Sequence, residues 1–247
     1  MQGLLPNFWR YLQMENSKAY KHLIEQINAT GSKRFDGYHP GIMEDIFDWE
    51  RDEVEDIIWK TFHQDKDMNL ASFLPQLKKY DGIGALKELL ARSIIPSYAS
   101  VAVSSALYEY TGDDNYLDII KQNIDKSKGE ISYVAILSYC KPCRKAYDLL
   151  VEIYINSDDT TNRSTAILGI LYNKGFIVDP LNMHDRMATT ELSRKFFTDD
   201  VNERKTIIKM LETGQFEKFK GQFYSKNITG YEKIELRECD EVPIPPC

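Results

Sequence analysis

Apolar residues recur at three- and four-residue intervals along most of this chain, which is the spacing of one face of an α-helix. Met43, Ile46 and Phe47 follow this rule, and so do Ile58 and Phe62. Turn-forming Gly, Asp and Pro residues interrupt the pattern at short intervals, as helix ends do. The expected helices after the N-terminal region include residues 70–80, 83–92, 98–110, 116–124, 146–155, 191–197 and 201–211.

The apolar positions also repeat every 31 residues, which is the sequence signature of a repeat protein. Three columns of residues are apolar at every step, and a fourth has one exception, Ser105. Within a unit the columns lie 3, 8 and 4 residues apart, which is helical spacing. The columns are Ile46, Leu77, Tyr108, Tyr139 and Ile170; Val54, Ala85, Tyr116, Tyr147 and Val178; Ile58, Leu89, Ile120 and Val151; and Met43, Leu74, Ser105, Ile136 and Ile167.

A unit of two helices cannot bury its apolar face alone, whereas stacked units share a continuous core. We therefore expect an all-α fold, an α-solenoid of antiparallel helix pairs with a repeat of about 31 residues. The chain is interpreted as one domain over residues 1–247. Its expected parts are N-terminal capping helices (1–41), repeats (42–181), C-terminal helices (182–225) and an irregular tail (226–247) with one short strand at most.

Two segments resemble the short HEAT-like repeat of armadillo-type proteins. They are residues 77–90 (LKKYDGIGALKELL) and 106–120 (ALYEYTGDDNYLDII). In each, a first helix ends in a Gly/Asp turn, and a second begins with small or aromatic residues. The resemblance covers roughly residues 42–181 and implies the solenoid architecture. Proteins of this kind serve as scaffolds, transport receptors, toxin-neutralising immunity proteins of bacteria and, rarely, DNA glycosylases.

The composition is that of a globular protein, with 43% hydrophobic and 28% charged residues. A formal net charge of −7 disfavours a nucleic-acid partner, because phosphate binding needs clustered Lys and Arg, and it favours a basic protein partner. The first residues lack a basic segment followed by a long apolar one, and no apolar run has the length of a membrane span. Four cysteines are too few for a disulfide framework, so we expect a cytoplasmic protein with reduced thiols and no membrane partner.

The sharpest chemical motif is Cys140-Lys-Pro-Cys143, which is similar to the thiol pair of thioredoxin-like redox sites. A redox role requires a strand over residues 131–139 and a helix after the second cysteine. The repeat register instead places both cysteines in a turn between helices, which favours a structural role. A zinc site would need Cys239 and Cys247, whose spacing is unsuitable, so we expect no metal and no cofactor.

Two aromatic residues and four carboxylates lie outside the apolar columns on the second helices of the units, which line the concave face in HEAT-like solenoids. We expect them to be solvent-exposed and to form an acidic binding surface with aromatic anchors. They are Trp59, Tyr154, Glu55, Asp118, Asp148 and Glu152.

These features favour a non-catalytic interaction protein that holds a basic protein or peptide on its concave face. The most specific form of this interpretation is a bacterial immunity protein that neutralises a toxin. An enzyme is the alternative. It would be a thiol–disulfide redox protein that uses Cys140 and Cys143, or a HEAT-like DNA glycosylase, which would need a basic groove that the composition disfavours.

Overall fold

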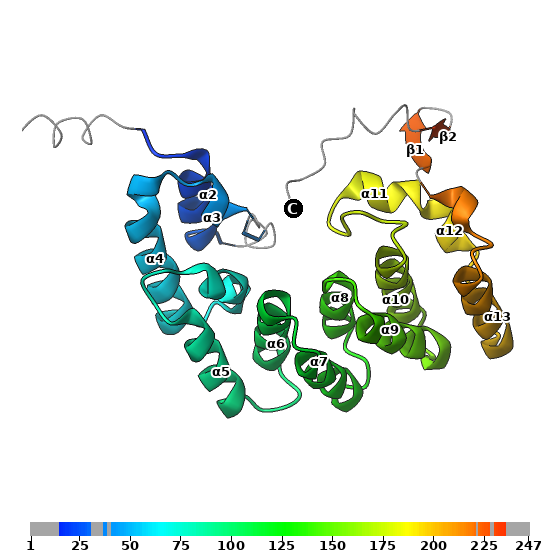
Figure 1. Cartoon of the computed structure of the whole chain (residues 1–247), viewed down its shortest axis with the longest axis horizontal. Coiled ribbons are helices and arrows are strands. Elements are labelled where there is room, and N and C mark those ends of the chain that lie inside the picture. Colours follow the sequence, from blue (N-terminus) through cyan, green and yellow to red (C-terminus); the bar gives the residue numbers. More distant parts are fainter. Residues whose placement is uncertain (1–14, 31–36, 39–40, 221, 228–229, 236–247) are drawn as a thin grey trace, which may run out of the picture. The chain divides into compact units, whose positions relative to one another are not determined.

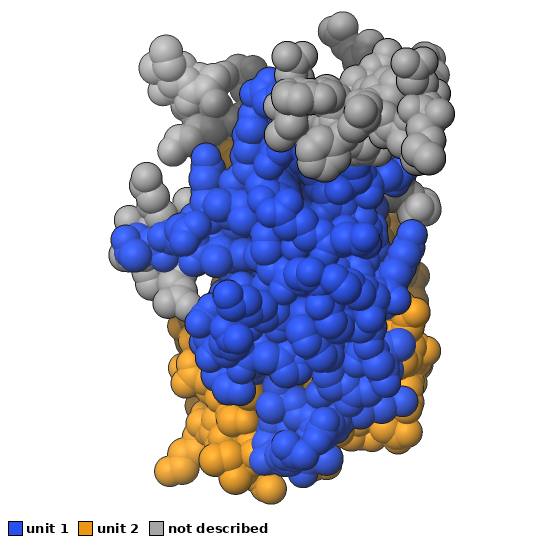
Figure 2. All heavy atoms as spheres, turned by 90° about the vertical axis from the view of Figure 1, so that its left-hand side faces the viewer, with its two compact units in different colours: residues 1–93 blue, residues 94–247 orange. Residues whose placement is uncertain are grey.

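The structure, a computed structural model, describes residues 15–30, 37–38, 41–220, 222–227 and 230–235. This part of the chain is mainly α-helical, with one two-stranded hairpin near its C-terminal end (Figure 1). Main-chain contacts divide the protein into two compact units, residues 1–93 and 94–247, which Figure 2 shows in blue and orange. Most of the expected tail, residues 236–247, lies outside the described residues.

The first unit consists of short helices around a small apolar core. Its fully buried residues include Val54, Ile58, Leu70, Leu74 and Leu86. Among its described residues, the α-helices are α2 (Lys18–Ile27), α3 (Ile42–Asp45), α4 (Arg51–Gln64) and α5 (Gly82–Arg92), and two 3-10 helices span Asp48–Glu50 and Met68–Gln76.

One expected helix of the first unit has a different form. Residues 70–80 were expected to be one regular helix, but the chain forms the 3-10 helix Met68–Gln76 and then turns. Pro75 lies inside this segment, where it has no N–H to donate to a preceding carbonyl. Leu70 and Leu74 are nevertheless fully buried, so the apolar pattern correctly identified the inward face.

The described part of the second unit contains a series of α-helices of 5 to 14 residues. They are α6 (Tyr98–Thr111), α7 (Asn115–Lys126), α8 (Ile131–Tyr139), α9 (Arg144–Asn156), α10 (Thr160–Asn173), α11 (Met183–Ala188), α12 (Thr190–Arg194) and α13 (Val201–Glu212). The 3-10 helix Glu217–Phe219 precedes strands β1 (Gln222–Asn227) and β2 (Gly230–Glu235).

The larger helices of the second unit form two rows. Helices α6, α8 and α10 are neighbours in one row, and α7, α9 and α13 are neighbours in the other (Figure 1). Helix α6 packs on α7, and α9 packs on α10, so the rows share one apolar core. Leu117, Ile120, Leu137, Leu150 and Ile170 are fully buried in this core.

Burial does not follow the 31-residue register at every step. The buried residues of α9 lie 30 residues after those of α7, as Leu117 and Tyr147 or Ile120 and Leu150 show. Val151, which the register assigns to the core, is therefore only half-buried. Val178, at the end of another column, is 69% exposed because it lies after α10 and outside any helix.

The C-terminal part contains more strand than expected. The first four residues of strand β1, 222–225, fall in the region expected to hold the C-terminal helices, and its last two fall in the expected irregular tail. It pairs antiparallel with β2, with Gln222 opposite Glu235 and Asn227 opposite Gly230. No helix was predicted after residue 211, and main-chain hydrogen bonds between the two strands give this segment its regular structure.

Candidate functional site

Helices α7 and α9 lie side by side and are bridged by two ion pairs. Lys145 Nζ lies 2.6 Å from Asp118 Oδ2, and Lys121 Nζ lies 3.0 Å from Glu152 Oε1. Asp148, also on α9, pairs with an arginine on its own helix. Three of the expected site carboxylates therefore stand on two adjacent helices, but each is matched by a basic side chain, so this surface is less acidic than expected.

Lys121 holds two carboxylates at once. Its side chain is 15% exposed, and its Nζ also lies 2.7 Å from Asp125 Oδ1. Burial alone would lower the pKa of Lys121, but hydrogen bonds to Asp125 and Glu152 outweigh it and raise the pKa. The Lys121 side chain therefore stays positively charged at neutral pH.

A cavity of about 440 Å³ lies beside this cluster, at the C-terminal ends of α7 and α9 and the N-terminal end of α10. Ile124, Val134 and Ile153 form its apolar part. Four carboxylates and two ammonium groups form its charged part, so negative charge predominates and a cationic group is favoured there. These charged residues are Lys121, Asp125, Lys128, Glu152, Asp158 and Asp159.

Asn162, in the first turn of α10, lines the cavity and is 4% exposed. Its Nδ2 donates to the carbonyl oxygen of Gly129 at 2.6 Å. This bond sets the amide orientation, because the reverse orientation would place two acceptors against each other. The buried Oδ1 has no hydrogen-bond partner in the described part of the chain. A buried acceptor left unsatisfied costs about 1–3 kcal/mol, so a donor that reached this oxygen would be stabilised.

The loop between α7 and α8 is shaped for this contact. Gly129 has φ +82°, and a Cβ there would lie 2.6 Å from Asn162 Nδ2. The preceding residue, Lys128, also has a positive φ of 59°. A glycine is therefore required where the loop approaches α10.

Asp159 caps the N-terminus of α10 and lines the same cavity. Its Oδ1 accepts hydrogen bonds from the backbone N–H groups of Thr161 at 2.7 Å and Asn162 at 3.0 Å. These two bonds lower the pKa of Asp159. Its carboxylate stays ionised at neutral pH and adds negative charge at the cavity.

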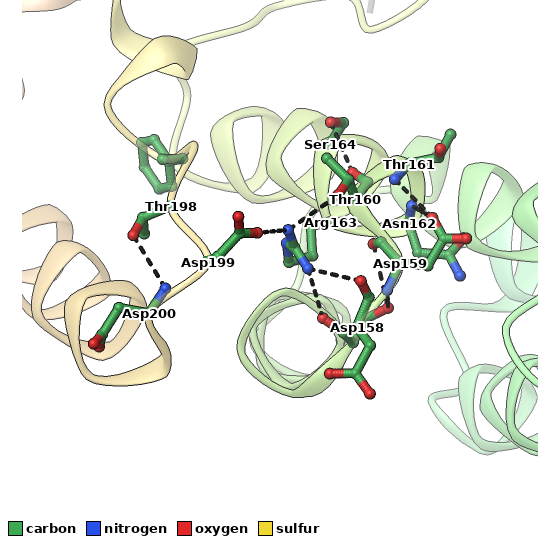
Figure 3. Close-up of polar contacts among 12 residues, drawn as sticks. Asp158, Asp159, Thr160, Thr161, Asn162, Arg163, Ser164, Thr198, Asp199 and Asp200 are labelled. Atoms are coloured by element: carbon green, nitrogen blue, oxygen red, sulfur yellow. Dashed lines mark hydrogen bonds and ion pairs between the residues drawn. The ribbon is translucent and has the colours of Figure 1, made fainter.

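A buried arginine holds the loop before α10 in place (Figure 3). Arg163 Nη1 donates to the carbonyl oxygens of Ser157 at 3.1 Å and Asp158 at 3.0 Å, and Arg163 Nη2 pairs with Asp199 at 2.6 Å. Neither Asp158 nor Asp159 makes an ion pair with another residue in the described ranges.

Glu55 was expected to be solvent-exposed, and this prediction is wrong: its side chain is 1% exposed. One carboxylate oxygen accepts from the backbone N–H groups of Lys78 at 2.9 Å and Lys79 at 2.7 Å, and the other from Arg51 Nε at 2.8 Å. Burial alone would raise the pKa of Glu55, but these hydrogen bonds outweigh it and lower the pKa. Glu55 therefore has a structural role, because its hydrogen bonds connect α4 to residues 78 and 79 within the first unit.

Tyr154 was also expected to be an exposed anchor, and it is fully buried instead. Its ring packs edge-on against Phe196 at 5.7 Å, and its hydroxyl donates to the carbonyl oxygen of Phe196 at 2.7 Å. Tyr154 lies 30 residues after Ile124, so the shortened spacing between α7 and α9 places it in the core. Burial raises the pKa of its hydroxyl to about 12.

Trp59 belongs to the first unit and is half-buried. Its ring stacks on Tyr80 at a centroid distance of 4.5 Å and contacts His63 at 4.0 Å. Its role as a binding anchor stays a prediction.

The two motif cysteines are free thiols with different environments. Cys140 is buried, and burial raises its pKa to about 12, so it is protonated at neutral pH. Cys143 caps α9, and its Sγ accepts from the backbone N–H of Ala146 at 3.3 Å. The strand that a redox site would need before Cys140 is not there, because residues Ile131–Tyr139 form α8.

Sequence reasoning identified Glu152 but missed the other polar residues around the cavity. Asp159 and Asn162 carried a detectable signal, since an Asp before Thr-Thr-Asn is a good helix N-cap. Gly129 and Lys121 carried no such signal in the sequence. Gly129 contacts a residue 33 positions later and Lys121 one 31 positions later, and a local pattern does not reveal such contacts.

No model of a protein family, no curated protein and no solved structure matches this chain. Within the described ranges, no group of three or more His, Cys, Asp or Glu side chains is placed to hold a metal ion. None of the helices described is long and apolar enough to cross a membrane.

Proposed function

We propose that this protein is a non-catalytic interaction module that binds a basic protein or peptide at the surface of α7 and α9. The observation that carries the proposal is the cavity of about 440 Å³ in which carboxylates outnumber ammonium groups. The ion pair between Lys121 of α7 and Glu152 of α9 lies at one border of this cavity. Complementary charge of this kind speeds encounter with a basic partner and disfavours other partners.

The proposed architecture is a HEAT-like α-solenoid across residues 42–181. Polar contacts between residues about one repeat apart support it in the second unit. Lys121 and Glu152 are 31 residues apart, Gly129 and Asn162 are 33 apart, and Tyr108 donates at 2.9 Å to the carbonyl of the residue 33 positions later. Stacked two-helix units make such contacts between successive repeats.

In its most specific form, the proposal is that the partner is a toxin domain and that this protein is a cytoplasmic immunity protein that neutralises it. The support is the resemblance to HEAT-like inhibitors together with an acidic binding cavity. Such a protein would work by occupying its partner and would itself need no catalytic group.

The enzymatic alternatives have less support. Thiol chemistry at neutral pH needs an accessible thiolate, whereas Cys140 is buried with a pKa of about 12. A DNA glycosylase needs a basic groove for the phosphate backbone, whereas the cavity carries more carboxylates than ammonium groups.

Affinity capture with matched baits tests the proposal. The wild-type protein, a Glu152→Lys variant and a control Glu203→Lys variant would be exposed to a host lysate, and the bound proteins quantified by mass spectrometry. A basic protein retained by the wild type and the control but lost with Glu152→Lys is the expected result. Equal capture by all three baits would place the interface elsewhere.

A further inference from the structure

We propose that the cavity beside α10 is a receptor site for the guanidinium group of an arginine side chain on the protein partner. This inference rests on the proposed function, since it names the chemistry of the group that the partner inserts. The site combines carboxylates of the loop 157–159 with the buried amide oxygen of Asn162.

The charge balance of the cavity leaves room for one more cation. Asp125 and Glu152 already share the ammonium group of Lys121. Asp158 and Asp159 make no ion pair with any residue that the structure describes. Lys128 also lines the cavity without an ion pair among these residues, so a cation that enters meets two carboxylates that have no ion-pair partner, and one ammonium group.

The Asn162 amide is an independent sign of a missing donor. Its Nδ2 is committed to Gly129 and its Oδ1 is buried without a partner. The loop approaches this amide closely, since a Cβ at position 129 would lie 2.6 Å from Asn162 Nδ2. The unsatisfied oxygen lies on a residue that lines the cavity, where a ligand N–H would complete it.

A guanidinium group fits these acceptors better than an ammonium group does. It carries five N–H donors in one plane, so it serves a carboxylate and an amide oxygen at the same time. It is also more weakly hydrated, which lowers the cost of entering a partly apolar cavity. The three apolar lining residues, Ile124, Val134 and Ile153, suit the methylene stem of arginine.

Titration with small capped amino acids tests the site without the partner. The probes are N-acetyl-arginine amide, its neutral isostere N-acetyl-citrulline amide, and N-acetyl-lysine amide. Binding is followed by ¹H–¹⁵N NMR, with the backbone amide of Gly129 and the side-chain amide of Asn162 as reporters. We expect saturable shifts at both reporters with the arginine probe, weaker ones with lysine and none with citrulline.

Two aspartates provide a matched pair of variants. Asp159→Asn keeps the helix cap and removes the charge, and we expect it to weaken binding of the arginine probe about three- to fivefold. Asp200 caps α13 in the same way, with bonds from Asn202 and Glu203 at 2.7 and 2.9 Å, but does not line the cavity. Asp200→Asn should therefore leave binding unchanged.

Several results would overturn the inference. These are shifts of equal size with citrulline or with lysine, no shift at either reporter, or equal weakening by the two variants. The proposed function is tested separately, by partner capture. If the Glu152→Lys variant captures the partner as well as the wild type does, the proposed function is wrong even when the arginine probe binds. Conversely, loss of capture without probe binding would retain the interaction surface and reject the guanidinium site.

Discussion

Leu150 and Val151 are neighbours on α9, and they distinguish the observed packing from the 31-residue register. The register pairs Val151 with Ile120 as a core position. In the structure Leu150 is fully buried, whereas Val151 is half-buried, because the buried pattern recurs after 30 residues at this step. The 31-residue register therefore predicts that Val151→Ala destabilises the protein more than Leu150→Ala, and the observed packing predicts the reverse.

The magnitudes follow from what each substitution removes. Leu150→Ala deletes three buried carbon atoms, which costs roughly 2.4 kcal/mol in transfer free energy. The cavity left behind in a packed interface places the total at about 2–5 kcal/mol. Val151→Ala deletes two carbon atoms from a half-buried site, so its cost stays below about 1 kcal/mol.

Urea unfolding followed by circular dichroism measures both changes in the free energy of unfolding, provided that the m-values match the wild type. We expect Leu150→Ala to cost at least about 1 kcal/mol more than Val151→Ala. Ile120→Ala, at the equivalent buried position of α7, should resemble Leu150→Ala. A larger loss for Val151→Ala than for Leu150→Ala would refute the 30-residue step and restore the uniform register.

Three other predictions concern the cavity loop, the helix caps and the thiols. Gly129→Ala should destabilise the protein more than Gly112→Ala in urea unfolding, because both have positive φ but only Gly129 would also clash with Asn162. Backbone hydrogen bonds hold the folded pKa values of Asp159 and Asp200 below the unfolded value, so their stabilisation is present at neutral pH and is lost as the pH falls below about 4; the double Asp→Asn variant should show a flatter decline of melting temperature with acidity, and an unchanged decline would contradict this. Iodoacetamide should label Cys143 well before Cys140 in the folded protein, and equal labelling rates mapped by mass spectrometry would show that Cys140 is not protected.

Much of the helical framework was predictable because its boundaries depend on local chemistry. The expected helix 116–124 corresponds to α7, which spans Asn115–Lys126, and the turn at Gly112 ends α6 as expected. Gly112 has φ +69°, which glycine adopts without strain. Residues 131–139 were ambiguous because a short apolar run suits a strand or a helix, and neighbouring helices decide it in favour of α8.

The candidate site was less predictable because burial depends on partners far along the chain. The 31-residue register predicts that Tyr154 faces outward, but a one-residue change of spacing places it in the core, where a carbonyl satisfies its hydroxyl. The register also predicts that Glu55 lies on the surface, but two backbone N–H groups 23 and 24 positions later donate to its buried carboxylate. A periodic pattern identifies helices and does not fix which polar side chain finds such a partner.

Hydrogen–deuterium exchange of the complex with a captured partner tests the central claim most directly. The account predicts new protection of backbone amides around the cavity, at the end of α7, the loop before α8, and the loop between α9 and α10. This protection should be absent when the Glu152→Lys variant replaces the wild-type protein in the mixture with the partner. A complex that forms with strong protection only in residues 15–93, while residues 121–134 and 152–163 exchange as in the free protein, would contradict the proposed binding surface.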